Sequence, residues 1–261
     1  MSLGWKQYLP LLKKKKRHEA EKCLIEGVRL CREALVSQWE IEVAFVTQAF
    51  ADSTHWTTFE DTFRHHGIEW RVLGDQQFKR LSDTESPQGI LLVMQIPRDR
   101  YRRPSLRRAS FVLLLDGIRD PGNLGTLIRT ADWYGVNAII LSQDSVDPYN
   151  PKVLRSSMGA IFHVPVYFSE NLADDAAALK EHRYWIVAAA VNGKKVLQTT
   201  HFKKPVALVL GSEARGISPS LQNRADLTVR IWKYGQAESL NVAVAGGVTM
   251  HHIAAQIFDT R

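Results

Sequence analysis

The sequence predicts an α/β protein in which most of the chain forms a parallel sheet covered by helices on both faces. Short apolar strands alternate with helical segments from residue 109 onwards, and such strands are typical of parallel sheets buried on both faces. The chain has 261 residues, of which 45% are hydrophobic, which excludes a disordered chain and allows one or two domains. No apolar run reaches the roughly 18 residues of a membrane span, so no membrane partner is expected.

The first 97 residues predict a smaller domain in which helices and strands alternate. Apolar residues recur with helical spacing over 17–36, which places Cys23 and Cys31 on one helix. Further helices are expected at 54–66 and 75–81, and strands at 41–46, 69–73 and 90–96. The two cysteines fit neither a disulfide framework nor a zinc site, so we expect reduced, buried thiols and a cytoplasmic location.

From residue 109 the pattern predicts a second domain with a cleaner alternation of strand and helix. Asn150-Pro151 is typical of a helix start, a cap followed by proline at the first helical position, and a long final helix is expected over 239–258. The segment 98–108, rich in proline and arginine, has no apolar periodicity and predicts a linker. The expected domains are therefore 1–97 and 109–261, joined by 98–108. The expected strands of the second domain are 111–115, 138–141, 164–168, 185–191, 206–210 and 227–231.

The net charge of +7 is unevenly distributed along the chain. One basic cluster runs from Lys13 to Arg17, and a second places six arginines within 98–108. Such clusters attract a phosphate backbone and make binding depend on salt. A single cluster fits a solvated surface equally well, but two clusters that flank one domain favour a nucleic acid as the partner.

Three separated segments carry the candidate chemistry. They are FVLLLDGIRDPGNLGTLIRTADWYG (111–135), VALVLGSEARGIS (206–218) and RIWKYGQAESLNVAVAGG (230–247). In this order they resemble the three motifs of the SpoU/TrmH family of RNA ribose 2'-O-methyltransferases, over about the last 150 residues. The first domain resembles, more weakly, the small α/β/α RNA-binding domain that precedes the catalytic domain in many SpoU enzymes.

The resemblance implies several properties that the periodicity alone does not indicate. It implies a trefoil-knotted catalytic domain of the SPOUT type, whereas general topology rules predict an unknotted sheet. It also implies S-adenosylmethionine as the methyl donor, no metal, and a homodimer that builds each site from two chains.

The resemblance maps Arg129 onto the arginine that acts in catalysis in this family. A guanidinium keeps its proton at neutral pH. We therefore expect Arg129 to grip the neighbouring phosphate and to stabilise the developing alkoxide, while a phosphate oxygen or water takes the proton. The alternative is a structural salt bridge with Asp116 or Asp132.

Four further residues complete the expected catalytic set. Asn123, at the start of the helix that carries Arg129, either caps that helix or orients Arg129 or the ribose. Glu213 is expected to partner an arginine or the substrate. Ser239 is expected to cap the final helix and to bond substrate, and Asn241 to bond backbone or ligand.

The resemblance places the cofactor against backbone groups of the second and third motifs. Gly211 is expected to let the backbone approach the cofactor, because glycine has no Cβ. Trp232-Lys233 replaces the family's usual Pro-Met and predicts a bulkier, more basic pocket wall. Gly246-Gly247 costs a helix about 1 kcal/mol per glycine, which predicts close packing against another helix, as across a dimer interface. The expected cofactor residues are Leu210, Gly211, Gly216, Ile231, Ser239 and Leu240.

The function expected from these features is methylation of a ribose 2'-hydroxyl in structured RNA. Ribosomal RNA is the favoured substrate, transfer RNA is the alternative, and DNA is not expected. A second alternative is an RNA-binding homologue that has lost turnover through Trp232-Lys233. The presence of all five expected catalytic residues argues against it.

Overall fold

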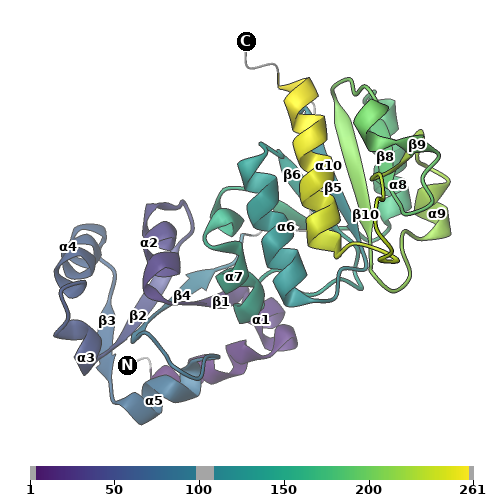
Figure 1. Cartoon of the computed structure of the whole chain (residues 1–261). Helices are drawn as coiled ribbons and strands as arrows, with labels where there is room; N and C mark the ends of the chain where they lie inside the picture. Colours follow the sequence, from purple (N-terminus) through teal and green to yellow (C-terminus); the bar gives the residue numbers. More distant parts are fainter. Residues whose placement is uncertain (1–3, 98–108, 259–261) are drawn as a thin grey trace. The chain divides into compact units, whose positions relative to one another are not determined.

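The computed structural model describes residues 4–97 and 109–258, which form two compact units (Figure 1). The first unit holds 4–97 together with Asp147–Phe162, and the second holds 109–146 and 163–258. The predicted linker 98–108, with its six arginines, lies outside the described residues. The sequence predicted one domain over 109–261, and the structure differs because Asp147–Phe162 packs within the first unit.

The first unit is built on a four-stranded sheet in the order β1-β4-β2-β3. Strands β1 and β2 run antiparallel to β4, and β3 runs parallel to β2. The strands are β1 (Lys22–Glu26), β2 (Ile41–Thr47), β3 (Trp70–Leu73) and β4 (Ile90–Gln95). The helices are η1 (Trp5–Leu12), α1 (Lys14–Ala20), α2 (Val28–Val36), α3 (Gln48–Ala51), α4 (Trp56–His66), α5 (Asp75–Leu81), α7 (Pro151–Ser157) and η3 (Ala160–Phe162).

The helix predicted over 17–36 is wrong. The chain instead leaves α1 through Glu21, whose φ of 52° is left-handed, forms β1, and enters α2 after Gly27 at φ 103°. Cys23 therefore lies on β1 and Cys31 on α2. The run Cys-Leu-Ile fits a buried strand as well as a helix, and periodicity cannot separate the two. The prediction of free, buried thiols is confirmed.

A buried ion pair holds the inserted segment in the first unit. Arg17, predicted to be part of a surface cluster, is only 2% exposed. Its Nε and Nη2 donate to Asp147 Oδ2 at 2.9 and 2.7 Å, and its Nη1 donates to the Leu11 and Leu12 carbonyls. Burial alone would raise the pKa of Asp147, but the hydrogen bond from His18 and the charge of Arg17 lower it below its usual value. Lys13 to Lys16 remain exposed, so they alone form the basic surface of this segment.

The second unit is built on seven parallel strands in the order β7-β6-β5-β10-β8-β11-β9. This sheet confirms the predicted fold class, and its order is consistent with the expected knot. The strands are β5 (Phe111–Asp116), β6 (Ala138–Leu141), β7 (Val166–Phe168), β8 (Trp185–Ala189), β9 (Lys195–Val196), β10 (Val206–Gly211) and β11 (Leu227–Arg230). The helices are α6 (Pro121–Trp133), α8 (Leu172–Glu181), η4 (Leu197–Thr199), α9 (Pro219–Gln222) and α10 (Val242–Ile257).

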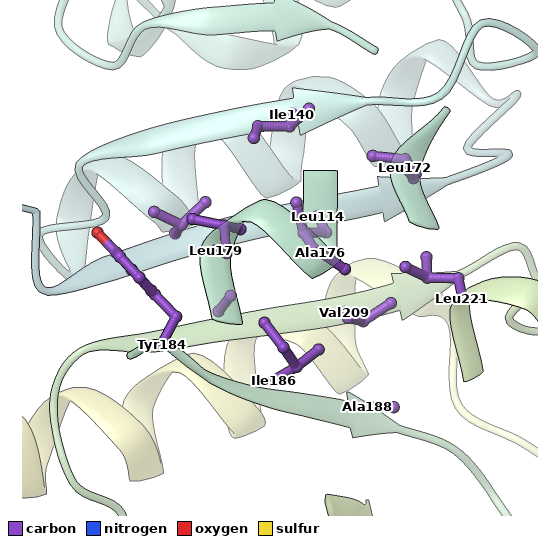
Figure 2. Close-up of a cluster of buried hydrophobic side chains, with 12 residues drawn as sticks. Leu114, Ile140, Leu172, Ala176, Leu179, Tyr184, Ile186, Ala188, Val209 and Leu221 are labelled. Carbon is purple, nitrogen blue, oxygen red and sulfur yellow. The ribbon is translucent and has the colours of Figure 1, made fainter. Parts of the chain in front are cut away.

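Helices cover both faces of this sheet. Figure 2 shows Leu172, Ala176 and Leu179 of α8 packed with side chains of β5, β6, β8 and β10 in one buried cluster. On the other face α10 packs against α6 and β10. Within the described ranges, no helix combines the length and the apolar character that crossing a bilayer requires.

The final helix begins later than expected and packs more closely on its own chain. Asn241 caps α10 by accepting from Ala243 N and Val244 N, so the prediction that Ser239 caps it is wrong. A Cβ at Gly246 would lie 2.6 Å from Leu127 Cδ2 and 2.8 Å from Leu210 Cδ1. Gly246 is thus required because α10 packs closely against α6 and against β10 of the same chain.

We expect Gly246→Ala and Gly247→Ala to differ in their effect on stability. Either alanine favours the helix by about 1 kcal/mol, but overpacking a filled core costs about 1–3 kcal/mol. A Cβ at Gly247 would only touch Thr130 Cγ2 at 3.7 Å. Urea unfolding should therefore show Gly246→Ala to be about 1–3 kcal/mol less stable than Gly247→Ala. Equal stabilities would contradict this packing.

Candidate active site

A cavity of about 880 Å³ opens beside the carboxyl ends of β8 and β10 in the second unit. Its wall combines the loop after β10, the loop between β11 and α10, and the start of α10. The volume falls within the roughly 300–1,000 Å³ of small-molecule sites. All of the expected cofactor residues line it: Leu210, Gly211, Gly216, Ile231, Ser239 and Leu240.

The loop after β10 is a narrow turn closed by its own backbone. Ser212 N donates to Gly216 O at 3.1 Å, and Gly216 N donates to Ser212 O at 2.8 Å. A Cβ at Gly211 would overlap the backbone of Gly216, which itself has a φ of 66°. Glycine is therefore required at 211 because a side chain there would collide with the backbone of Gly216. The turn places Glu213 beside the cavity.

The Glu213 carboxylate joins residues of all three motifs. Its Oε1 accepts from Asn241 Nδ2 at 2.7 Å, from Asn123 Nδ2 at 3.2 Å and from Val242 N at 3.2 Å. Asn241 Nδ2 also donates to Asn123 Oδ1 at 2.9 Å, while Asn241 Oδ1 caps α10. Each amide thus has its donor and acceptor ends engaged, which fixes the orientation of both asparagines.

Asn123 does not cap α6, so the capping alternative is wrong. Asp120 takes that place by accepting from Asn123 N at 2.7 Å, with Pro121 at the first helical position. The side chain of Asn123 contacts Glu213 and Asn241, and no hydrogen bond to Arg129 is seen within the described ranges. The Asp-Pro pair is a readable start signal that could have identified this cap.

Arg129 lies on the exposed face of α6 and is not among the residues that line the cavity. The salt bridges considered as its alternative role are not formed. Asp116 accepts instead from Ser218 N at 2.7 Å, and Asp132 lies 3.0 Å from His163 Nδ1. Within 4–97 and 109–258, no hydrogen bond or ion pair engages the Arg129 guanidinium.

The remaining expected residues lie on the cavity wall. Ser239 is exposed there, and Trp232 and Lys233 also line the cavity, as the substitution for Pro-Met predicted. Trp232 and Tyr234 place their ring centroids 6.3 Å apart. In the part of the chain that the structure describes, no three His, Cys, Asp or Glu side chains cluster so as to hold a metal ion.

One feature of this edge was not anticipated. Asp144, three residues after β6 ends, binds both Arg119 and Arg215. The sequence signal for this cluster was a charged residue within four positions of the end of each of three buried strands, because the carboxyl ends of parallel strands share one edge.

We expect Glu213→Ala to loosen the first turn of α10. Val242 N would lose its acceptor, and the Asn241 side chain would lose one of the two acceptors that hold its amide nitrogen. Hydrogen exchange followed by mass spectrometry should show faster exchange over Val242–Val244, with little change near the helix end. Glu238→Ala is the matched control, since Glu238 also lines the cavity but makes none of these bonds; equal effects of the two variants would argue against the network.

Comparison with known proteins agrees with this fold. Residues 110–251 match the SpoU rRNA Methylase family, and residues 5–92 match the MRM3-like substrate binding domain. The chain is 36% identical over 248 residues to the 23S rRNA (guanosine(2553)-2'-O)-methyltransferase RlmP of Bacillus subtilis, covering 95% of this chain and 94% of that protein.

Solved structures match over both units. The SpoU methyltransferase AviRb from Streptomyces viridochromogenes, in complex with AdoMet, aligns with a TM-score of 0.87 at 26% identity and covers 100% of each chain. A putative RNA methyltransferase of the TrmH family from Porphyromonas gingivalis aligns with a TM-score of 0.81 at 30% identity and covers 97% of each chain. With its three motif segments gathered at one sheet edge and a family match over 110–251, this chain belongs to the SpoU rRNA methylase family.

Proposed function

We propose that this protein transfers a methyl group from S-adenosylmethionine to the 2'-hydroxyl of a ribose in ribosomal RNA. The observation that carries the proposal is the Glu213 carboxylate, which holds Asn123 and Asn241 beside a cavity of about 880 Å³. The relative named for 2'-O-methylation of 23S rRNA spans nearly the whole of this chain, which favours ribosomal over transfer RNA. A cytoplasmic location is part of this proposal.

The cavity suits an amphipathic cofactor. Leu210, Ile217 and Val229 supply apolar wall, whereas Glu213 and Ser239 supply polar groups. The segment 231–241 forms neither helix nor strand. Trp232 N donates to Gln198 Oε1 and the Asn241 carbonyl accepts from Ala245 N, and other backbone groups of the segment would bind the adenine and the methionine part. When bound, S-adenosylmethionine supplies an electrophilic methyl group on a sulfonium. The AviRb structure and an rRNA methyltransferase structure from Sinorhizobium meliloti hold AdoMet.

Methyl transfer requires the hydroxyl to lie in line with the departing sulfur. Holding the two reactants in this orientation can lower the reaction barrier by about 7–11 kcal/mol. The Asn123–Glu213–Asn241 network fixes the wall against which the ribose is placed. Arg129 supplies positive charge for the phosphate and the developing alkoxide, because its guanidinium keeps its proton and cannot act as the base.

We also propose a homodimer, since Arg129 does not line the cavity of its own chain. Trp133 lies one helical turn beyond Arg129 on α6 and is 83% exposed. On α10, which packs against α6, Val244 and Val248 are 53% and 40% exposed and are spaced one turn apart. Exposed apolar side chains on two helices that pack together favour a protein interface. A second copy seated here would bury them and would bring Arg129 to the partner's cavity.

We expect Arg129→Ala to lower methyl transfer to a 23S rRNA transcript by at least about 10²-fold, the loss typical of one charge-stabilising donor. Cofactor binding, measured by calorimetry, should persist because Arg129 is not on the cavity wall. Arg224→Ala, which removes another exposed arginine of the second unit, is the control and should retain activity. Turnover near that of the unmodified protein would discard the role of Arg129.

Light scattering should report about twice the 29.6 kDa mass of the chain. Trp133→Glu combined with Val248→Glu should yield a folded monomer that binds cofactor without transferring methyl groups. Mixing Arg129→Ala with a variant whose cavity is blocked, Leu240→Arg, should restore part of the activity, since one site of the mixed dimer would be intact. A fully active monomer would refute the shared site.

A further inference from the structure

Two arginines and one aspartate meet at the carboxyl ends of three adjacent strands in the second unit. Arg119 follows β5, Asp144 follows β6 and Arg215 follows β10, and β6, β5 and β10 are neighbours in the sheet. Asp144 Oδ2 accepts from Arg215 Nη2 at 2.6 Å and from Arg119 Nη2 at 3.3 Å. One carboxylate oxygen thus gathers two cations from separate loops.

The aspartate is itself held in place. Asp144 Oδ1 accepts from Ser142 Oγ at 2.7 Å, and Ser142 Oγ accepts from Gly117 N at 2.8 Å. The hydrogen bond from Ser142 outweighs partial burial and, with those from Arg215 and Arg119, lowers the pKa of Asp144. Gly117 has a φ of 70°, and a Cβ there would lie 3.3 Å from Asp144 Oδ2, so glycine leaves room for this arrangement.

The cluster carries more positive charge than its internal pairing requires. A single arginine would neutralise Asp144, so the second leaves the group with a net charge of about +1. The side chains of Arg119 and Arg215 are 65% and 62% exposed. Each guanidinium gives Asp144 only one of its five N–H donors. The remaining donors form the planar fork that matches a phosphate.

The position of the cluster indicates which anion it meets. Arg119 lies in the loop before α6, four residues before Asn123, and Arg215 lies in the loop after β10, two residues after Glu213. Arg215 lines the cavity, whereas Arg119 does not. The pair therefore extends outward from the rim of the cavity, where the backbone of an RNA bound at the cavity would pass.

We propose that Arg119 and Arg215 form a binding site for a backbone phosphate next to the target ribose, and that Asp144 is the positioning residue that holds them. This inference rests on the proposed function. The cofactor carboxylate is the other anion of similar chemistry at this edge, and we favour the phosphate because Arg119 lies off the cavity wall.

The test measures binding of a 23S rRNA transcript at several salt concentrations, together with KM and kcat. Arg119→Gln and Arg215→Gln should each raise Kd and KM with a smaller effect on kcat. Together they should reduce the slope of log affinity against log salt by about 1, the effect of one lost phosphate contact. Lys180→Gln is the matched control. Lys180 pairs with Asp226, which accepts from Ile186 N at the amino end of β8, away from the site.

The variant Asp144→Asn distinguishes two effects of Asp144 on RNA binding: holding the two arginines in place, and adding a negative charge near the RNA. Removing a negative charge should tighten RNA binding if the arginines act independently of Asp144, whereas loss of the clamp should weaken it. We expect a raised Kd and an unchanged midpoint of thermal unfolding. An unchanged or lowered Kd would overturn the positioning role of Asp144.

Two further outcomes decide the remaining points. If the arginine variants lower affinity for S-adenosylmethionine and leave RNA binding unchanged, the site holds the cofactor carboxylate and the phosphate inference fails. If the unmodified protein methylates no ribosomal RNA, but the arginine variants still show the reduced slope of log affinity against log salt, the proposed function fails and the phosphate site stands.

Discussion

The carboxylate of Glu213 is the interaction on which the candidate site depends. One oxygen atom accepts from two asparagine amides and one backbone N–H, and these donors belong to segments that are 90 and 28 residues away along the chain. Its position is set by the narrow turn after β10, which exists because Gly211 and Gly216 allow two backbone strands to touch. The start of α10, the rotamer of Asn123 and one wall of the cavity follow from that turn.

A second constraint is the close packing of α10 on its own chain. Gly246 lets α10 approach α6 and β10 until Leu127 and Leu210 fill the space that a Cβ would occupy. This approach leaves the opposite side of α10, with Val244 and Val248, exposed. The same helix thus closes the core of its own chain and offers an apolar surface outward. The sequence predicted that Gly246-Gly247 serves a dimer interface. The need for glycine at 246 is explained instead by packing within one chain.

The sheet of the second unit was predictable because most of its strands are largely apolar and lie between helices, as at β6 and β10. The first unit was harder, since the run Cys23 to Ile25 satisfies a helix and a buried strand equally. Burial of Arg17 could not be foreseen, because its partner is 130 residues away in the sequence. The family resemblance placed Asn123, Glu213 and Asn241 in one catalytic set, but their hydrogen bonds to one another needed coordinates. The start of α6 at Asp120-Pro121 could have been predicted from these two residues alone, without any tertiary information.

Because Asp147–Phe162 belongs to the first unit, the order in which the chain is synthesised constrains when that unit can be completed. Trp39 packs its ring against Tyr149 and Phe162, and among the described residues the carboxylate that pairs with Arg17 is that of Asp147. A ribosome that adds about 5–20 residues per second therefore spends some seconds between residue 97 and residue 162 with this core unfinished and a cation unpaired in it. During that interval β5, α6 and β6 of the second unit emerge. Neither unit is an independent module of the gene, and a cut or fusion placed between residues 97 and 109 would separate the first unit from a part of its own interior.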